Sequence, residues 1–312
     1  MNSAASHQQS PIVAMNRPMA ANSTIGLSTS KEPGSIIVSP LFLATHFPSW
    51  YVLLAVAVPM MWFFYSDYKA FKALGPGGTP STPLGYLRIK ILSMFALRNP
   101  YIPAPIHEYI RPQHGYLTSL PQRIGPRPHV EGIAPHRQSD QRASKDMFAA
   151  LDTRLKIMAQ EKNNSLKLGT SCFEKHGTGL FSLDPIARTC RGEVCHAHPS
   201  DGSLHMTLHP ADAALVLRHG HGERHPLARG GFFRRFVPAE FVMIYAPRDE
   251  EELDTVVEIV EAAVWWVSGV RVPKNGSGSL CDAQDKDLGQ YCRGCKEKYC
   301  GVRSTMAKKL QD

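Results

Sequence analysis

The sequence lacks the patterns that identify several common classes of protein. It has no catalytic triad and no Gly-rich loop of the kind that binds phosphate groups. Its net charge is +8, yet the basic residues are scattered, and no nucleic-acid-binding motif accompanies the densest group of arginines, at 218–235. These absences argue against a triad hydrolase and a phosphate-loop enzyme, and we expect no nucleic-acid partner.

Charge is missing from one long segment. From Pro33 to Ser66 there is no Asp, Glu, Lys or Arg, and the end of this segment (WYVLLAVAVPMMWFFY) is almost wholly apolar. Residues 47–66 are long enough to cross a bilayer, and they carry Trp or Tyr near both ends, as membrane interfaces favour. A cleaved signal peptide fits poorly because the run starts far into the chain and lacks a basic leader. We therefore predict a transmembrane helix at 47–66, with a buried core helix as the alternative.

The segments on either side of this span differ in charge. Residues 1–46 are rich in Ser, Asn, Pro and Gln without periodicity, so we expect a disordered tail. Only Arg17 and Lys31 precede the span, whereas five Lys or Arg residues lie between 69 and 98. Positive residues favour the cytosolic side of a membrane. The sequence therefore predicts a single-pass protein of the endoplasmic reticulum membrane with its C-terminal domain in the cytosol.

Three glycosylation sequons offer a test of this orientation. Asn22 precedes the span, whereas Asn163 and Asn275 follow it. Glycans are a mark of secreted and luminal segments, so the predicted orientation allows a glycan at Asn22 alone. A glycan on either of the other two asparagines would reverse the orientation.

The placement of the domain also affects how the seven cysteines are interpreted. The cytosol keeps thiols reduced, so we expect metal binding, lipidation or simple packing in place of disulfides. Four cysteines lie in the tail at 271–312, and two of them have the Cys-x-x-Cys spacing of zinc sites, although a long gap follows the first. Structural zinc, palmitoylation and free thiols all stay open for this Cys-rich tail. Its cysteines are Cys281, Cys292, Cys295 and Cys300.

The rest of the chain divides into a connection and a domain. Residues 67–143 are rich in turns and prolines, and within them Tyr86–Leu97 predicts an amphipathic helix that lies on the membrane or covers the domain. From 144 to 270 helical and strand patterns alternate. This pattern predicts an α+β fold in which helices pack on one side of an antiparallel sheet, preceded by one N-terminal transmembrane helix. Its clearest elements are helices at 147–158 and 249–267 and a buried strand at 240–246.

Histidine is concentrated in one part of this domain: seven of the fourteen fall between His196 and His225. Asp201-Gly202 lies there between two alternating runs, which is the strongest short-range signal of a two-residue hairpin turn. This turn places His198 directly opposite His205, with His196 on the same face. The opposite face is apolar, and we expect it in the core. It carries Cys195, Ala197, Leu204, Met206 and Leu208.

Several motifs surround this hairpin in a fixed order. They read TSCFEKH (170–176), EVCHAH (193–198), SLHMTL (203–208), GERHPLA (222–228) and YAPRDEEE (245–252). With Asp67-Tyr68 directly after the apolar span, this set resembles the fungal luciferase family over residues 47–267. The resemblance leaves out the N-terminal tail and the Cys-rich end.

The resemblance implies an oxygenase. Luminous members of the family add O2 to a hydroxylated styryl-pyrone without flavin, haem or nucleotide, and the resulting peroxide loses CO2. For this chain it implies O2 as co-substrate, no cofactor, and an apolar aromatic or polyketide-like substrate at the lipid bilayer. The stretch Gly220–Gly222 and the Arg-rich stretch Arg229–Phe236 depart from the luminous pattern. Light emission is therefore not implied, and the substrate stays open.

Such an oxygenase needs a base that ionises the substrate and donors that hold the resulting anion. We expect His198 or His205 to be the base, with His196 or Glu174 orienting it. The two arginines among the substrate-binding candidates have an alternative role, which is to tie loops together through salt bridges. The substrate-binding candidates are His176, Arg224, His225, Tyr245 and Arg248.

The same imidazoles permit a different interpretation. Two or three histidines on one hairpin face, completed by Glu174 or Glu193, are similar to an iron facial triad or a zinc site. A metal-dependent hydrolase or oxygenase is therefore a second hypothesis. A third is a non-catalytic member of the fold that binds a ligand or partner at the membrane. Because the family resemblance points to chemistry without a cofactor, we predict no metal at this site.

Overall fold

The largest element of the fold is a six-stranded antiparallel sheet, in the computed structural model that describes residues 49–187 and 189–272. Its strand order is β3-β4-β5-β6-β8-β7. A separate antiparallel pair joins β1 (Val130–Gly132) to β2 (His136–Gln138). The strands of the sheet are β3 (Leu166–Thr170), β4 (Thr178–Ser182), β5 (Glu193–Ala197), β6 (Leu204–Thr207), β7 (Gly222–Arg224) and β8 (Phe241–Ile244).

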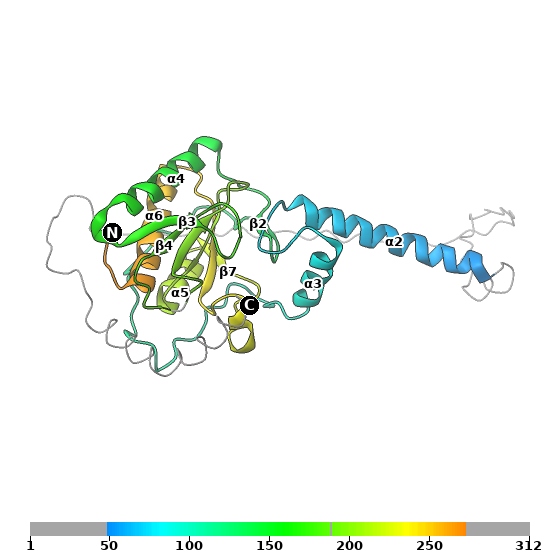
Figure 1. Cartoon of the computed structure of the whole chain (residues 1–312), viewed down its shortest axis with the longest axis horizontal. Helices are drawn as coiled ribbons and strands as arrows, with labels where there is room; N and C mark the ends of the chain where they lie inside the picture. Colours follow the sequence, from blue (N-terminus) through cyan, green and yellow to red (C-terminus); the bar gives the residue numbers. More distant parts are fainter. Residues whose placement is uncertain (1–48, 188, 273–312) are drawn as a thin grey trace, which may run out of the picture. The chain divides into compact units, whose positions relative to one another are not determined.

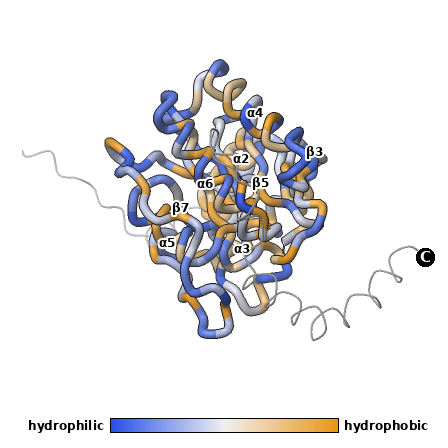
Figure 2. The backbone as a smooth tube through the Cα atoms, turned by 90° about the vertical axis from the view of Figure 1, so that its left-hand side faces the viewer, coloured by the Kyte–Doolittle hydropathy of each residue, from blue (hydrophilic) through white to orange (hydrophobic). Residues whose placement is uncertain are grey.

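Two helices cover one face of this sheet. Helices α4 (Lys145–Gln160) and α6 (Glu250–Ser268) contact each other, α4 packs against β3, and α6 packs against β4, β5 and β6 (Figure 1). In Figure 2, orange hydrophobic stretches gather toward the middle of the view and the outer loops are largely blue. The predicted α+β architecture is confirmed, with the expected apolar face of the hairpin in the core. That core includes Leu151, Cys195, Leu204, Met206, Leu208, Val256, Ile259 and Val260.

Local sequence signals explain where the helices begin and end. The side chain of Asp249 accepts a hydrogen bond from the backbone of Glu252 at the start of α6, and Gly269 ends that helix with φ 75. Helix α5 (Pro210–Arg218) begins with proline at its first position and contacts β7. Two short 3-10 helices complete the domain, η1 (Lys162–Asn164) and η2 (Gly231–Arg235).

The apolar segment near the N-terminus forms helix α2 (Ser49–Ala73), which is long and apolar enough to cross a membrane. It runs beyond the predicted span, and among its residues, all of them described, only Phe71 is buried. Helix α3 (Pro83–Ser93) follows, capped by the Thr82 hydroxyl, and it lies earlier in the chain than the predicted Tyr86–Leu97 helix. Residues of α2, α3 and β8 share a second apolar cluster with Ile133, Leu227 and Val237. The N-terminal tail and the four tail cysteines lie outside the described residues.

The β5–β6 hairpin differs from its prediction in register. His196 pairs with His205, and a backbone hydrogen bond of 2.8 Å joins His198 to Ser203, so four residues form the loop where two were expected. A type I′ turn requires positive φ at both central residues, but only Gly202 of the Asp-Gly pair has it (φ 80). The prediction that His198 lies opposite His205 is therefore wrong. Because the shift is two residues, the histidines still share one face.

Candidate active site

A cavity of about 510 Å³ lies on the histidine-bearing face of the sheet, a volume within the range of about 300–1,000 Å³ that is typical of small-molecule sites. One wall is polar and is built from β2, the loop before β4, β5, β6 and the segment after β7. The other wall is apolar and includes residues of α3 and β8. The polar wall contains His136, Glu174, His196, His205 and His225; the apolar wall contains Ile89, Leu92, Ile133, Phe173, Leu227, Phe236 and Phe241.

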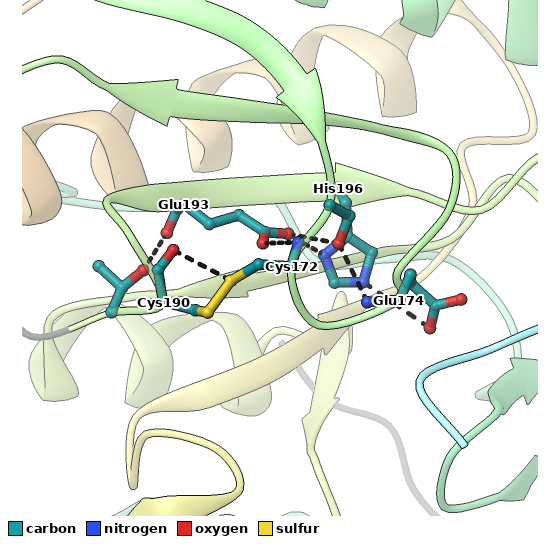
Figure 3. The surroundings of a disulfide bond; sticks show 7 residues. Cys172, Glu174, Cys190, Glu193 and His196 are labelled. Atoms are coloured by element: carbon teal, nitrogen blue, oxygen red, sulfur yellow. Dashed lines mark hydrogen bonds and ion pairs between the residues drawn. A yellow bond between two sulfur atoms is a disulfide. The ribbon is translucent and has the colours of Figure 1, made fainter. Parts of the chain in front are cut away.

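His196 is oriented by a carboxylate on its own strand (Figure 3). Its Nδ1 lies 2.6 Å from Oε1 of Glu193, and Glu193 in turn accepts hydrogen bonds from the Ser171 hydroxyl and the Cys172 backbone. This contact places the ring hydrogen on Nδ1. The Nε2 atom of His196 is buried and has no hydrogen-bond partner within the described part of the chain. It faces Oε1 of Glu174 at 3.9 Å.

Three further imidazoles form a chain of contacts with one another. Nδ1 of His198 lies 2.8 Å from the Ser203 hydroxyl, which donates to Asp201 at 3.0 Å. Nε2 of His198 lies 3.0 Å from Nδ1 of His205, and Nε2 of His205 lies 3.0 Å from Nδ1 of His136. All five of these side chains are buried. These contacts therefore join β2, the residue that follows β5, and β6 through side chains.

The far end of this chain reaches strand β7. Nε2 of His136 lies 3.4 Å from Oε1 of Glu223, and the Tyr245 hydroxyl donates to Oε2 of the same carboxylate at 3.0 Å. Burial, together with the neighbouring Glu223 charge, raises the pKa of Tyr245, so its hydroxyl keeps its proton and acts as a donor. Tyr245 thus supports the site from behind, and it does not line the cavity.

Burial also decides the charge of the histidines. Desolvation lowers the pKa of His198, His205 and His225 well below the usual value, and the other charges around them act in the same direction. These rings are therefore neutral near pH 7. His225 uses both of its nitrogens: Nδ1 accepts from the Leu227 backbone at 3.1 Å, and Nε2 contacts the Ile133 carbonyl at 2.9 Å.

Glu174 is held by an arginine that sequence reasoning missed. Arg137 of β2 donates to both carboxylate oxygens of Glu174, at 3.2 and 2.5 Å, and also to the Pro76 carbonyl at 2.7 Å. The bidentate contact fixes the carboxylate so that Oε1 points toward His196 and His198, at 3.9 and 3.7 Å. Arg137 and His136 lie about sixty residues before the hairpin, in a segment where the sequence shows recurring His and Pro but no period.

The structure brings together only some of the expected site residues. Glu174, His196, His205 and His225 line the cavity, and His198 lies behind them. The other four candidates do not line it. His176 is exposed, Arg224 donates to the carbonyls of Ile102, Ala228 and Ala239, and Arg248 pairs with Glu252 and the Ile124 carbonyl. Arg248 thus forms the expected salt bridge with the acidic run at 250–252, whereas Arg224, within the described residues, binds only backbone carbonyls, and Tyr245 binds Glu223.

A disulfide joins Cys172 to Cys190 at the edge of the cavity (Figure 3). The sequence-based expectation that disulfides are absent is therefore wrong. Hydrogen bonds from Ser171 and Cys172 to the Glu193 carboxylate hold the loop before β4 beside the start of β5, with 6.3 Å between the Cα atoms of the two cysteines. Cys195 is free and buried, and desolvation raises the pKa of its thiol, so it is a packing residue.

Two groups of side chains offer donor atoms at a spacing that suits a metal ion. One comprises Glu174, His196, His198 and His205, and the other comprises His136, His205 and His225; within each group the donor atoms lie within 4.8 Å of one another. The second group is the less suitable metal site, because both ring nitrogens of His225 already contact backbone groups. The polar wall can therefore accept an anionic oxygen, a proton or a cation.

The fold and the cavity define an α+β domain with a cavity of small-molecule size that is lined in part by imidazoles. Residues 191–263 match the model of the luciferase domain. The luciferase of Neonothopanus nambi is 31% identical over 231 residues, which cover 69% of this chain and 84% of that protein. The luciferase of Armillaria ostoyae is 32% identical over 232 residues, with the same coverage. The chain belongs to the fungal luciferase family. No solved structure gives a significant match.

Proposed function

We propose that this protein is a membrane-anchored, O2-dependent oxygenase that acts on a hydroxylated pyrone or another aromatic, polyketide-like compound. The observation that carries the proposal is the cavity, which is lined by aromatic and aliphatic side chains together with buried histidines and the Glu174 carboxylate. Its relatives are luciferases. Light emission is not part of the proposal, because it requires a particular product as well as an oxygenase fold.

The apolar wall suits a flat aromatic ring. Phe173 and Phe241 lie with ring centroids 4.6 Å apart, and Phe241 stacks on His205 at 5.2 Å. Ile89 and Leu92 of α3 complete this side. A substrate ring that replaces water against these side chains gains about 25 cal/mol for each Å² of apolar surface that is buried.

The polar wall suits the hydroxyl-bearing part of the substrate. O2 reacts with an electron-rich anion, so the substrate hydroxyl must lose its proton, and we propose that this happens beside Glu174, His196 and His205. Positively charged side chains that line the same cavity, Lys175 and Arg235 among them, can attract the anion. These two residues take the role that the sequence assigned to Arg224 and Arg248. O2 is the co-substrate, and the proposal includes no flavin, haem or nucleotide.

The membrane provides a route for such a substrate. Helix α2 is the proposed anchor, and α3 contributes Ile89 and Leu92 to the cavity while Leu87 and Ile91 of the same helix are exposed. A helix with apolar residues on both sides is suited to lie at the bilayer surface and pass an apolar compound inward. We propose that the substrate enters from the bilayer by this helix.

We propose the cytosol as the compartment of the domain, on the basis of the basic residues that follow the span. The Cys172–Cys190 disulfide is the observation that favours the lumen of the endoplasmic reticulum, where disulfides persist. The chemistry of the cavity is the same in either compartment. A glycosylation test given below distinguishes the two.

Oxygen uptake tests the function. The full chain in detergent would be mixed with a panel of hydroxylated pyrones and related polyketide-like phenols, and O2 consumption would be followed with an electrode. We expect uptake with some members of the panel and at least a hundredfold loss in His205→Ala, with wild-type rates in an exposed-site control, Glu131→Gln. Compounds that bind but are not consumed would instead support a non-catalytic binding protein. Turnover without O2 uptake would support a metal-dependent hydrolase.

A further inference from the structure

We propose that Glu174, His196, His198 and His205 bind one divalent first-row transition-metal ion at the polar wall of the cavity. This inference departs from the expectation of a metal-free site. Ion binding itself does not depend on the proposed oxygenase function, although the role suggested below for the ion rests on that function. Two observations carry it: the spacing of the donor atoms and the partners that fix them.

The spacing fits a single ion. Oε1 of Glu174 lies 3.9 Å from Nε2 of His196 and 3.7 Å from Nε2 of His198, and the latter lies 3.0 Å from Nδ1 of His205. Donors bound at about 2.1 Å are about 3.4 Å apart in a tetrahedral site and about 3.0 Å apart when adjacent in an octahedral one. These three separations lie within about 0.5 Å of one of those values, and all four donor atoms lie within 4.8 Å of one another.

Each donor has a partner on its outer side. Nδ1 of His196 faces Glu193 at 2.6 Å, and Nδ1 of His198 faces the Ser203 hydroxyl at 2.8 Å. Nε2 of His205 faces His136 at 3.0 Å. Metal-bound histidines characteristically donate their second ring hydrogen to such partners, which leaves the inward nitrogen free to bind the ion. For His196 that inward nitrogen is the buried Nε2 without a hydrogen-bond partner among the described residues.

Glu174, the fourth donor, is also fixed by a neighbouring side chain. Arg137 donates hydrogen bonds to both carboxylate oxygens of Glu174. An arginine behind a carboxylate ligand fixes its orientation, because the planar guanidinium matches both oxygens. Each of the four donors is thus fixed by a neighbouring side chain, and Oε1 of Glu174 can use its second lone pair for an ion.

The chemistry of the donors indicates the class of ion. Three imidazoles and one carboxylate suit Fe²⁺, Mn²⁺, Co²⁺ and Zn²⁺, and they are poor ligands for Ca²⁺ or Mg²⁺, which prefer oxygen donors alone. In the proposed oxygenase the ion would bind the substrate hydroxyl and lower its pKa, so that the anion forms at neutral pH. His205 then acts as a ligand and not as a free base.

Metal analysis of the full chain tests the inference. The Cys-rich tail is a possible second zinc site, so the background carries Cys281→Ser, Cys292→Ser, Cys295→Ser and Cys300→Ser. We expect about one transition-metal ion per chain, and less than about a tenth in His196→Ala. A buried histidine away from the cluster provides the matched control: His209→Asn should keep the ion. Near-UV circular dichroism identifies any variant that fails to fold.

Cobalt provides a second readout that does not depend on activity. After treatment with a chelator, Co²⁺ should restore one equivalent with visible d–d absorption, and that spectrum should be lost or shifted in Glu174→Gln. Protein that neither carries an ion nor takes up Co²⁺ would overturn the inference, as would equal metal content in the His196→Ala variant. Metal-free protein that still consumes O2 would remove the ion's proposed role and leave the oxygenase. Protein that binds the ion but consumes no O2 would keep the ion site and contradict the proposed oxygenase function.

Discussion

Nδ1 of His196 lies 2.6 Å from Oε1 of Glu193, three residues earlier on the same strand. This contact points the other nitrogen of His196 at Glu174 and the cavity. Glu193 is itself fixed by Ser171 and Cys172, so the orientation of the ring is determined by the fold and does not depend on substrate. Glu193 is therefore a positioning residue of the site.

Replacing Glu193 should weaken the site without removing a ligand. In Glu193→Gln a neutral amide replaces the carboxylate that contacts His196. The imidazole ring of His196 is then no longer held in one orientation. We expect the Kd for Co²⁺ to rise about 10–100-fold, the usual effect of losing such a partner. Glu131→Gln, at an exposed carboxylate, should leave the Kd unchanged. An unchanged Kd in Glu193→Gln would show that Glu193 does not position His196.

The stability of the domain should fall in mild acid because of His209. Nδ1 of His209 caps α5 by accepting from Ala211, and Nε2 contacts the Pro112 carbonyl. Burial lowers the pKa of His209 to about 4. The unfolded chain has a value of about 6.5, so the stabilisation is fully present above pH 6.5 and is lost as the pH falls toward 4.

We expect this group to remove about 3 kcal/mol from the free energy of unfolding between pH 7 and 4. Asparagine can cap a helix without titrating, so His209→Asn should show a shallower slope in a denaturant series over that range. Parallel curves for the two proteins would contradict the assignment. The variant's lower stability at pH 7, from lost packing against Trp266, does not affect the comparison of slopes.

Replacing two glycines by alanine distinguishes the energetic cost of backbone strain from that of steric crowding. Gly202 in the hairpin loop and Gly75 before the domain both have positive φ, 80 and 81. A Cβ on Gly202 would lie 2.4 Å from Cβ of Ala143, whereas one on Gly75 would meet nothing within 4 Å. Gly75→Ala should cost about 1 kcal/mol from strain, and Gly202→Ala about 1–3 kcal/mol more from overpacking. Equal melting temperatures of the two variants would show that the hairpin loop shifts to accommodate the added methyl group.

The sequence predicted the histidine face correctly and one of its pairings incorrectly. Side chains alternate along strands, so a register shift of two residues keeps His196, His198 and His205 together but changes which of them are opposite. The turn was misjudged because Asp201 uses its side chain to accept hydrogen bonds from Ser203 and Gln138, which stabilises a longer loop.

Other parts of the site could not be read from local patterns. His136 and Arg137 reach the hairpin through tertiary packing of a segment that has no periodicity, and neither residue belongs to a recognisable spacing. Arg224 and Arg248 were attractive because of their charge, yet charge alone does not reveal whether a side chain points into a cavity or toward carbonyl groups. By contrast, the boundaries of α6 follow from its own end residues, and the sequence predicted them closely.

Glycosylation of Asn163 distinguishes the two orientations. This residue is exposed in η1, so a luminal domain would present its sequon to the glycosylation machinery. With the domain in the cytosol, expression in eukaryotic cells should give a glycan at Asn22 alone. The shift on glycosidase treatment should then disappear in Asn22→Gln and persist in Asn163→Gln. A shift that persists in Asn22→Gln and becomes smaller in Asn163→Gln would place the domain in the lumen, in agreement with the Cys172–Cys190 disulfide.

The most direct test of the proposed chemistry follows the source of oxygen. The full chain and a consumed pyrone would be allowed to react under ¹⁸O2 in ordinary water, and the products would be analysed by mass spectrometry. We predict that the product contains ¹⁸O and that its formation is lost in His196→Ala. A product that contains oxygen only from water would contradict the oxygenase account and show that the cavity supports hydrolysis.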